Sequence, residues 1–201
     1  MVGERKVAYT TKELGPDTWP DFERLFEKHN GVQGGCWCMY YQRPRPIRTK
    51  VPRTERTAMN KKDKRSLVHE GQSHGTIVYK GRTPVGWCQY GPREELPRID
   101  AGRNYRKVGP LPPEKKLWRI TCFFVDRRYR RMEVSKAALH SALVAIRKNG
   151  GKAVEGYPVQ PPEKKFSSSM MWNGTVKLFQ EFRFSKVAPL GKRQWIVRKK
   201  L

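Results

Sequence analysis

Hydrophobic and polar positions are ordered most clearly between residues 117 and 150. The apolar run from Trp118 to Val125 predicts a strand, and a basic turn at 126–132 joins it to an amphipathic segment that ends at Gly150. Apolar side chains recur in that segment with the period of a helix. The N–H groups at a helix start lack partners and lie at the positive end of the helix dipole. Strand, turn and helix together therefore predict an anion site.

The pattern before this unit predicts one strand, two helices and a loop. Residues 5–10 predict the strand, and Asp17 predicts the cap of a helix whose apolar side chains follow at helical spacing. Glycine, proline, aromatic and arginine residues are mixed in 31–50, which predicts a loop. A charged helix is predicted at about 53–70, where Gly71 ends it.

A hairpin is predicted next, because a short turn containing Gly81 joins two apolar runs at 75–80 and 84–91. Residues 92–116 are polar and rich in proline, and they predict a long surface loop. The last predicted elements are a strand at 152–159, a helix at about 170–182 and a hairpin that ends at 194–199.

This order of elements predicts an α/β fold. A mixed sheet would be flanked by helices on both faces, in a single domain over residues 1–201. Residues 117–157 would form a βαβ unit, in which a right-handed crossover joins two parallel strands.

The net charge of the chain limits the classes of partner that it can bind. The chain has 43 Lys and Arg against 18 Asp and Glu, a net charge of +25, which attracts polyanions. The basic residues are spread along the chain and form no known nucleic-acid module, so we expect only nonspecific adhesion to nucleic acid.

No run approaches the roughly 18 apolar residues of a membrane span, and the N-terminus lacks a signal-peptide core. We therefore expect a cytoplasmic protein that does not bind membranes.

Four cysteines form no disulfide framework. Cys88 and Cys122 lie in apolar strand patterns and are typical of core thiols in a reducing compartment. Cys36 and Cys38 could supply two zinc ligands, but no second Cys or His pair follows at ligand spacing. A structural or pocket role is favoured for them, and no metal is expected.

Two motifs resemble the GNAT superfamily of acyl-CoA N-acyltransferases. The family signature at the helix start is Arg or Gln, two residues, Gly, one residue, and Gly or Ala; here 130–135 is RRMEVS. A second family pattern is Asn, an aromatic residue six positions later, and then Gly-Phe; here it is Asn173, Phe179 and Arg183-Phe184. The element order matches the family over nearly the whole length. Segments similar to a bacterial GNAT subgroup are 34–42, 86–91 and 118–125.

The resemblance implies that acetyl-CoA is the acyl donor and that the chain could form a homodimer. The cofactor-binding core would span about 117–160, with the pantetheine arm along Phe123, Phe124 and Val125. Asn173 and Phe179 correspond to further family positions at this site. The residues expected at the pyrophosphate are Arg130, Arg131, Met132, Glu133, Val134 and Ser135.

Three residues depart from the family pattern. Glu133 replaces a glycine and adds a negative charge beside a diphosphate. Arg183 replaces a second glycine, and Phe179 stands where many members have a tyrosine that protonates the leaving thiolate. An alternative hypothesis is therefore a catalytically weakened GNAT fold that acts as an acyl-CoA-binding or basic interaction module.

Acyl transfer to an amine needs a base and a donor to the thioester oxygen. The donor would be the backbone N–H near Val125. Glu155 is the preferred base, because a carboxylate between apolar neighbours can have a raised pKa; the alternative is that it pairs with an arginine or faces solvent. Glu94 and Glu95 are second candidates. Tyr157 could donate a proton, or simply pack.

An aromatic cluster suggests a pocket for the acceptor, although core packing would explain the same residues. Its members are Trp37, Met39, Tyr40, Tyr41 and Trp87. Loops 31–50 and 92–116 are the candidate acceptor-binding segments. The sequence thus favours an N-acetyltransferase that passes acetyl directly from acetyl-CoA to an amine of a small molecule or peptide.

Overall fold

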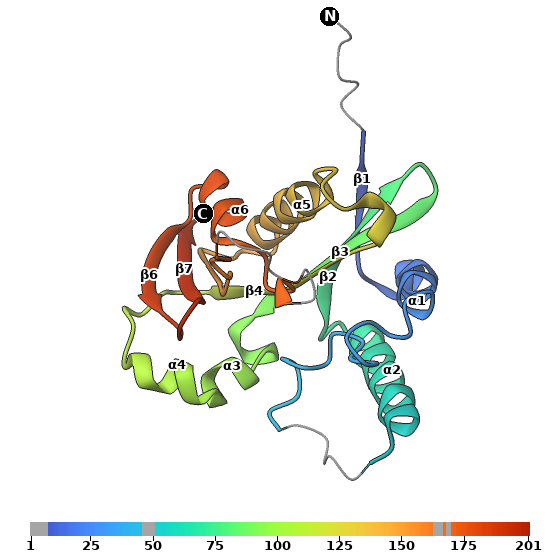
Figure 1. The fold of residues 1–201 in the computed structure, drawn as a ribbon, viewed down its shortest axis with the longest axis horizontal. Helices are drawn as coiled ribbons and strands as arrows, with labels where there is room; N and C mark the ends of the chain where they lie inside the picture. The colour runs from blue at the N-terminus through green and yellow to red at the C-terminus, as the bar shows by residue number, and fades with distance from the viewer. Residues whose placement is uncertain (1–7, 46–50, 163–166, 168–169) are drawn as a thin grey trace, which may run out of the picture.

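The computed structural model describes residues 8–45, 51–162, 167 and 170–201, and a seven-stranded sheet forms the centre of this part (Figure 1). The strand order is β1-β2-β3-β4-β5-β7-β6. Only β4 and β5 pair in parallel; the other neighbours are antiparallel, so the sheet is mixed as predicted. The strands are β1 (Thr10–Glu13), β2 (His74–Lys80), β3 (Thr83–Pro92), β4 (Leu117–Val125), β5 (Ala153–Gly156), β6 (Ser185–Pro189) and β7 (Trp195–Lys200).

Helices cover both faces of the sheet, as the sequence predicts. α5 and α6 pack with Val78, Cys88 and Ile120 in one core, whereas α1 packs with Ile77 and Trp87 on the opposite face. The residues of β2 and β3 alternate between these two cores because successive strand side chains point to opposite faces. The helices are α1 (Trp19–Glu27), α2 (Arg53–His69), α3 (Arg98–Ala101), α4 (Arg103–Val108), α5 (Val134–Lys148) and α6 (Val176–Glu181).

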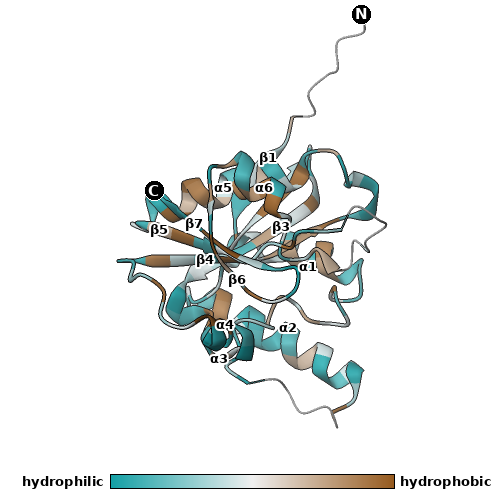
Figure 2. Ribbon diagram, turned by 60° about the vertical axis from the view of Figure 1, so that its left-hand side comes forward, coloured by the Kyte–Doolittle hydropathy of each residue, from teal (hydrophilic) through white to brown (hydrophobic). Residues whose placement is uncertain are grey.

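The long helix α2 is hydrophilic over most of its length, as Figure 2 shows. Only Lys64 and Val68 of this helix are buried. The Lys64 ammonium donates to the Gln42 side-chain oxygen at 2.7 Å, and burial lowers its pKa to about 8. The predicted charged helix is thus confirmed, with one buried charge that its sequence does not reveal.

The first strand and the first helix begin at other residues than predicted. The first strand is Thr10–Glu13 rather than 5–10, of which residues 5–7 lie outside the described part. Asp17 does not cap α1: it lies in a 3₁₀ turn, Pro16–Thr18, and Thr18 is the N-cap. Proline at the first position starts that turn ahead of the helix.

The segment 92–116, predicted as a loop, contains α3, α4 and a 3₁₀ turn. Arg119 on β4 holds it, because its guanidinium donates to the Leu96 carbonyl at 3.1 Å and to both Asp100 oxygens at 2.7 and 2.8 Å. These bonds join residues about twenty positions apart, so local pattern could not reveal them.

Two C-terminal elements are shorter than predicted. α6 begins only at Val176, because the Thr175 hydroxyl accepts from the Leu178 N–H at 3.2 Å and caps the helix there. β5 ends at Gly156, where it leaves β4. The predicted loop 31–50 is free of regular elements over 31–45, while 46–50 lie outside the described residues.

Candidate functional site

The sheet opens where β4 and β5 separate. Their parallel pairing ends at Ile120 and Gly156, while β4 continues to Val125. One edge of β4 beyond Ile120 is therefore not paired with β5. Such a gap in a sheet exposes backbone donors and acceptors that a ligand or another segment can use.

Part of this open edge is occupied by the chain itself. The Phe123 N–H donates to the Trp172 carbonyl at 2.5 Å, and the Asn173 side-chain amide donates to the Thr121 carbonyl at 2.6 Å. Backbone N–H groups alternate in direction along a strand, so the Val125 N–H faces the same edge as that of Phe123. The Val125 N–H is thus placed as a donor for an oxygen at this edge.

A groove of about 1,100 Å³ runs from this edge over the basic turn to α5 and α6. It brings together most of the residues that the sequence predicts at a cofactor, but not Met132, Asn173 or Phe179. The predicted residues that line it are Phe123, Phe124, Val125, Arg130, Arg131, Glu133, Val134 and Ser135. Arg127, Lys136 and Lys177 also line it, so basic side chains outnumber its two carboxylates, Glu133 and Glu181.

The turn keeps a backbone that suits glycine. Arg131 and Glu133 have φ angles of 61° and 63°, in the left-handed region that costs a residue with a β-carbon about 1–2 kcal/mol. The Glu133 side chain is exposed, and its carboxylate pairs with Lys136 at 2.8 Å. Glu133 therefore adopts the glycine conformation, while Lys136 offsets its charge.

The start of α5 supplies backbone donors. Val134 and Ser135 are the first two residues of the helix, so their N–H groups have no partner within it. The Lys136 and Ala137 N–H groups both donate to the Glu133 carbonyl, at 2.9 and 3.1 Å. Donors and a positive dipole end thus face the groove beside the arginines, and this donor set fits a diphosphate.

Tyr9 and Asp126 hold the basic turn in place through hydrogen bonds. The Tyr9 hydroxyl donates to the Met132 carbonyl at 2.8 Å. The buried Asp126 carboxylate accepts from the Lys28 ammonium at 2.5 Å and from the Arg128 N–H at 3.1 Å. Burial alone would raise the pKa of Asp126, but these two donors outweigh it and hold the pKa well below its usual range.

His29 also reaches the groove, although its sequence position gave no signal for it. Its ring lies 4.9 Å from that of Phe124, and its Nε2 is buried 3.6 Å from the Asp126 carboxylate. Burial lowers the pKa of His29 more than Asp126 raises it. A histidine that is neutral near pH 7 can accept a proton.

A second cavity adjoins the groove. Its volume is about 490 Å³, and it shares Val32, Gln33, Cys122 and Trp172 with the groove. We call it the arginine cavity, after Arg43, Arg53, Arg56 and Arg98 in its lining. Its size suits a small molecule.

The aromatic cluster of the sequence analysis was interpreted either as an acceptor pocket or as core packing, and the structure supports each for some of its residues. Trp37 and Trp87 are buried in the core beside α1, so packing accounts for them. Met39, Tyr40 and Tyr41 line the arginine cavity. Tyr40 and Tyr41 thus fit the pocket interpretation, whereas Met39 fits both, because it is also buried in that core.

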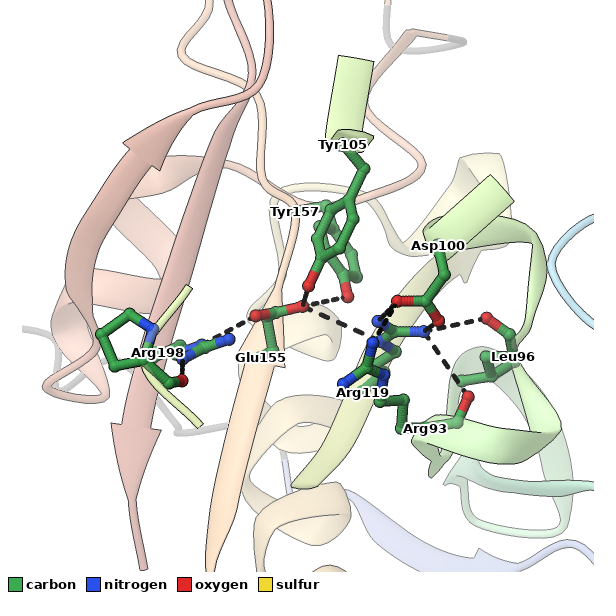
Figure 3. Close-up of polar contacts among 9 residues, drawn as sticks. Arg93, Leu96, Asp100, Tyr105, Arg119, Glu155, Tyr157 and Arg198 are labelled. Carbon is green, nitrogen blue, oxygen red and sulfur yellow. Dashed lines mark hydrogen bonds and ion pairs between the residues drawn. The ribbon is translucent and has the colours of Figure 1, made fainter. Parts of the chain in front are cut away.

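Glu155 lies in a buried polar network rather than in open space (Figure 3). One oxygen accepts from the Tyr157 hydroxyl at 2.5 Å and from the Tyr105 hydroxyl at 3.0 Å. The other oxygen accepts from Arg198 Nε at 2.7 Å, while Arg119 Nε lies 3.8 Å from the oxygen that the two tyrosines share. The alternative that Glu155 pairs with an arginine is thus what the structure shows.

Glu155 lines neither the groove nor the arginine cavity. Tyr157 is buried against it, and this burial together with the Glu155 charge raises the pKa of Tyr157 well above its usual value. A proton could reach Glu155 only through a hydroxyl such as that of Tyr157. Arg119 also belongs to this network, and no sequence signal pointed to it because its partners Leu96, Asp100 and Glu155 lie on other elements.

Four other predicted residues, Glu94, Glu95, Asn173 and Phe179, also lie outside the groove and the arginine cavity. Glu95 accepts from His74 at 2.8 Å, and its neighbour Glu94 is exposed. Asn173 braces the open edge and also donates to the Tyr41 hydroxyl at 3.0 Å. Phe179 is fully buried in the core, where a β-carbon on Gly156 would lie 2.4 Å from its ring.

All four cysteines are free thiols. Cys38 and Cys122 have their sulfur atoms 3.4 Å apart, where the arginine cavity meets the groove. The described residues contain no cluster of three or more metal-binding side chains. Nor does any described helix have the length and apolar character needed to cross a membrane.

Comparison with known proteins gives structural matches alone. No family model matches the chain, and no curated protein matches its sequence. The fold is similar to a GNAT-family protein of Desulfovibrio desulfuricans, with a TM-score of 0.53 at 12% identity over 96% of this chain and 99% of that one. It is equally similar to the PaiA N-acetyltransferase of Thermoplasma acidophilum in complex with coenzyme A (0.53, 12%, 96% and 99%). The GNAT domain of S. lividans PAT also matches (0.53, 15%, 95% and 89%).

The chain therefore has the GNAT fold, as the resemblance implied. At identities this low, the matches show the fold alone.

Proposed function

We propose that this GNAT-fold chain is an acyl-CoA-dependent N-acyltransferase that moves an acetyl group from acetyl-CoA directly to an amine. The groove carries the proposal, because it joins an open strand edge to a turn with unpaired N–H groups and arginines. Four free thiols suit a reducing compartment and support a cytoplasmic location.

Bound acetyl-CoA would supply the thioester that the amine attacks. The Val134 and Ser135 N–H groups, with Arg130 and Arg131, would hold the diphosphate. The Val125 N–H would donate to the thioester oxygen as negative charge develops there. The positive field of the groove would stabilise the departing thiolate, a task that Phe179 cannot perform.

The amine would enter through the arginine cavity, which meets the groove at Cys122 and Trp172. Two residues could take its proton. His29 lines the groove and has a lowered pKa, so it is neutral and can accept directly. Glu155 could accept only through one of the hydroxyls that donate to it, those of Tyr157 and Tyr105. We place His29 first, because no relay is needed.

A second candidate function is an acyl-CoA-binding module without turnover. The Trp172 carbonyl favours it, because it already uses the Phe123 N–H along which the pantetheine arm is expected. In an active enzyme the arm would pair with Val125 alone, or the Trp172 carbonyl would have to move aside.

Calorimetric titration of acetyl-CoA into protein freed of nucleic acid tests both functions, followed by release of free coenzyme A thiol with a mixture of amines. One-to-one binding with amine-dependent thiol release supports the enzyme. Binding without release supports the module. No binding contradicts both.

A further inference from the structure

The four arginines of the arginine cavity come from three segments of the chain. Arg43 comes from loop 31–45, Arg53 and Arg56 from the first turn of α2, and Arg98 from the start of α3. In Figure 1 this loop runs between α2 and α3. None of the four arginines lines the groove, so the cavity has a basic part that is separate from its junction with the groove.

The basic part of the cavity is not neutralised. Among the described residues, Arg43 is the one arginine of the cavity with a carboxylate partner, Asp63, and its Nε also donates to Asn60 at 3.3 Å. Arg53, Arg56 and Arg98 form no ion pair within the part of the chain that the structure describes. No aspartate or glutamate is among the described residues that line the cavity.

Arg98 is held in place by an aromatic ring. Its guanidinium carbon lies 3.9 Å from the centre of the Tyr40 ring, a cation–π contact that leaves the N–H donors of the guanidinium available. The first turn of α2 adds the positive end of its helix dipole to the same region. Several positive charges thus face one small volume.

The unpaired arginines favour amine acceptors that also carry a negative charge. A cationic acceptor such as a polyamine would be repelled by unpaired guanidinium groups, whereas a carboxylate or phosphate would form charge-assisted hydrogen bonds with them. The amine must still reach the junction at Cys122 and Trp172, where the thioester is expected.

We infer that the acceptor is a small amine that carries an anionic group, a carboxylate or a phosphate, and that Arg53, Arg56 and Arg98 bind this group while the amine points to the groove. The inference rests on the proposed function for the fate of the amine, but binding of the anionic group does not depend on turnover.

Matched probe pairs test the inference. β-Alanine is compared with β-alaninamide, and phosphoethanolamine with ethanolamine, so that each pair differs in the anionic group. Binding is measured by calorimetry in the presence of coenzyme A, and acetyl transfer from acetyl-CoA is measured as kcat/KM. We expect the anionic member of at least one pair to be favoured by about tenfold or more, and the pair shows whether carboxylate or phosphate is preferred.

Three variants and one control test whether these arginines cause the preference. Arg56→Gln and Arg98→Gln should each weaken the anionic probe by about tenfold, with little change for its neutral partner. Arg56→Lys keeps the charge and should retain part of the preference. Arg65→Gln, an exposed position of α2 outside the cavity lining, serves as the control and should change nothing.

The outcomes separate this inference from the proposed function. Equal affinity for both members of each pair, or a preference that survives both Gln variants, overturns the inference. Acetyl transfer to the neutral amines alone overturns it too, while the enzyme remains. Arginine-dependent binding of an anionic probe without acetyl-CoA binding supports the cavity assignment and contradicts the acyltransferase.

Discussion

Replacing Glu133 with glycine tests how the basic turn works. Glu133 has a φ of 63°, and its left-handed conformation costs about 1–2 kcal/mol for a residue with a β-carbon. Glycine removes this cost, but its greater backbone freedom stabilises the unfolded state by about 0.5–1 kcal/mol. The ion pair that is lost with Lys136 is exposed to solvent and contributes little. We therefore expect Glu133→Gly to raise the free energy of unfolding by about 0.5–1 kcal/mol.

The same substitution should tighten coenzyme A binding. Two unit charges about 7 Å apart in water interact by about 0.6 kcal/mol, and a diphosphate roughly doubles this. At a Debye length of about 8 Å, screening reduces the repulsion to about 0.5 kcal/mol. Because Lys136 already offsets part of the Glu133 charge, the expected gain in affinity is about twofold.

Glu133→Gln is the matched control, since it removes the charge but keeps the β-carbon and the left-handed backbone. Calorimetry with coenzyme A should give the same twofold gain for both variants, whereas urea unfolding should show stabilisation for the glycine variant alone. A gain in affinity for Gly without one for Gln would mean that the side chain, and not its charge, obstructs the cofactor. Weaker binding of both variants would refute the reasoning, because Glu133 would then help to hold the ligand.

Three further predictions concern titratable side chains elsewhere. Glu155→Gln should lower the free energy of unfolding in urea by about 3 kcal/mol, because Arg119 and Arg198 lose a buried partner; unchanged stability would contradict the structural role. His29→Gln should remove the acid limb of the kcat/KM profile, which in the unmodified chain should lie below pH 6.5 because the pKa of His29 is lowered; a limb that persists would exclude His29 as the base. Lys64 has a pKa lowered to about 8 from 10.5, so the unfolded state binds more protons and stability should rise by up to about 3 kcal/mol as pH increases from 8 to 10.5. Lys64→Met should abolish that rise, and a rise of the same size in the variant would assign it to another group.

The order of elements could be predicted from the sequence because each element depends on local pattern. The apolar run of β4, the basic turn and the period of α5 lie within 34 consecutive residues. The same pattern located the open donors at Val134 and Ser135, since every helix start leaves its first N–H groups unpaired. The limits of the elements were less well predicted: a 3₁₀ turn that begins at Pro16 precedes α1, and the late start of α6 depends on a single side-chain contact, the cap at Thr175.

The candidate site was predicted where the backbone forms it and was missed where distant side chains meet. The sequence placed Glu155 between apolar neighbours on a strand, and the structure places it there. Its partners Arg119 and Arg198 come from β4 and β7, which lie on either side of β5 in the sheet, and no local pattern records that contact. The contact between His29 and Phe124 likewise joins distant residues and could not be predicted from local pattern.

The sequence by itself determined the fold, the position of the anion-binding turn and the excess of positive charge, because these follow from hydrophobic period, backbone geometry and composition. Only the tertiary structure decided which arginines remain unpaired around one cavity and which are used in buried ion pairs. It also decided that the Trp172 carbonyl binds the open edge of β4. The physical reason is that ion pairs, cavities and edge contacts depend on distances in space between segments far apart along the chain.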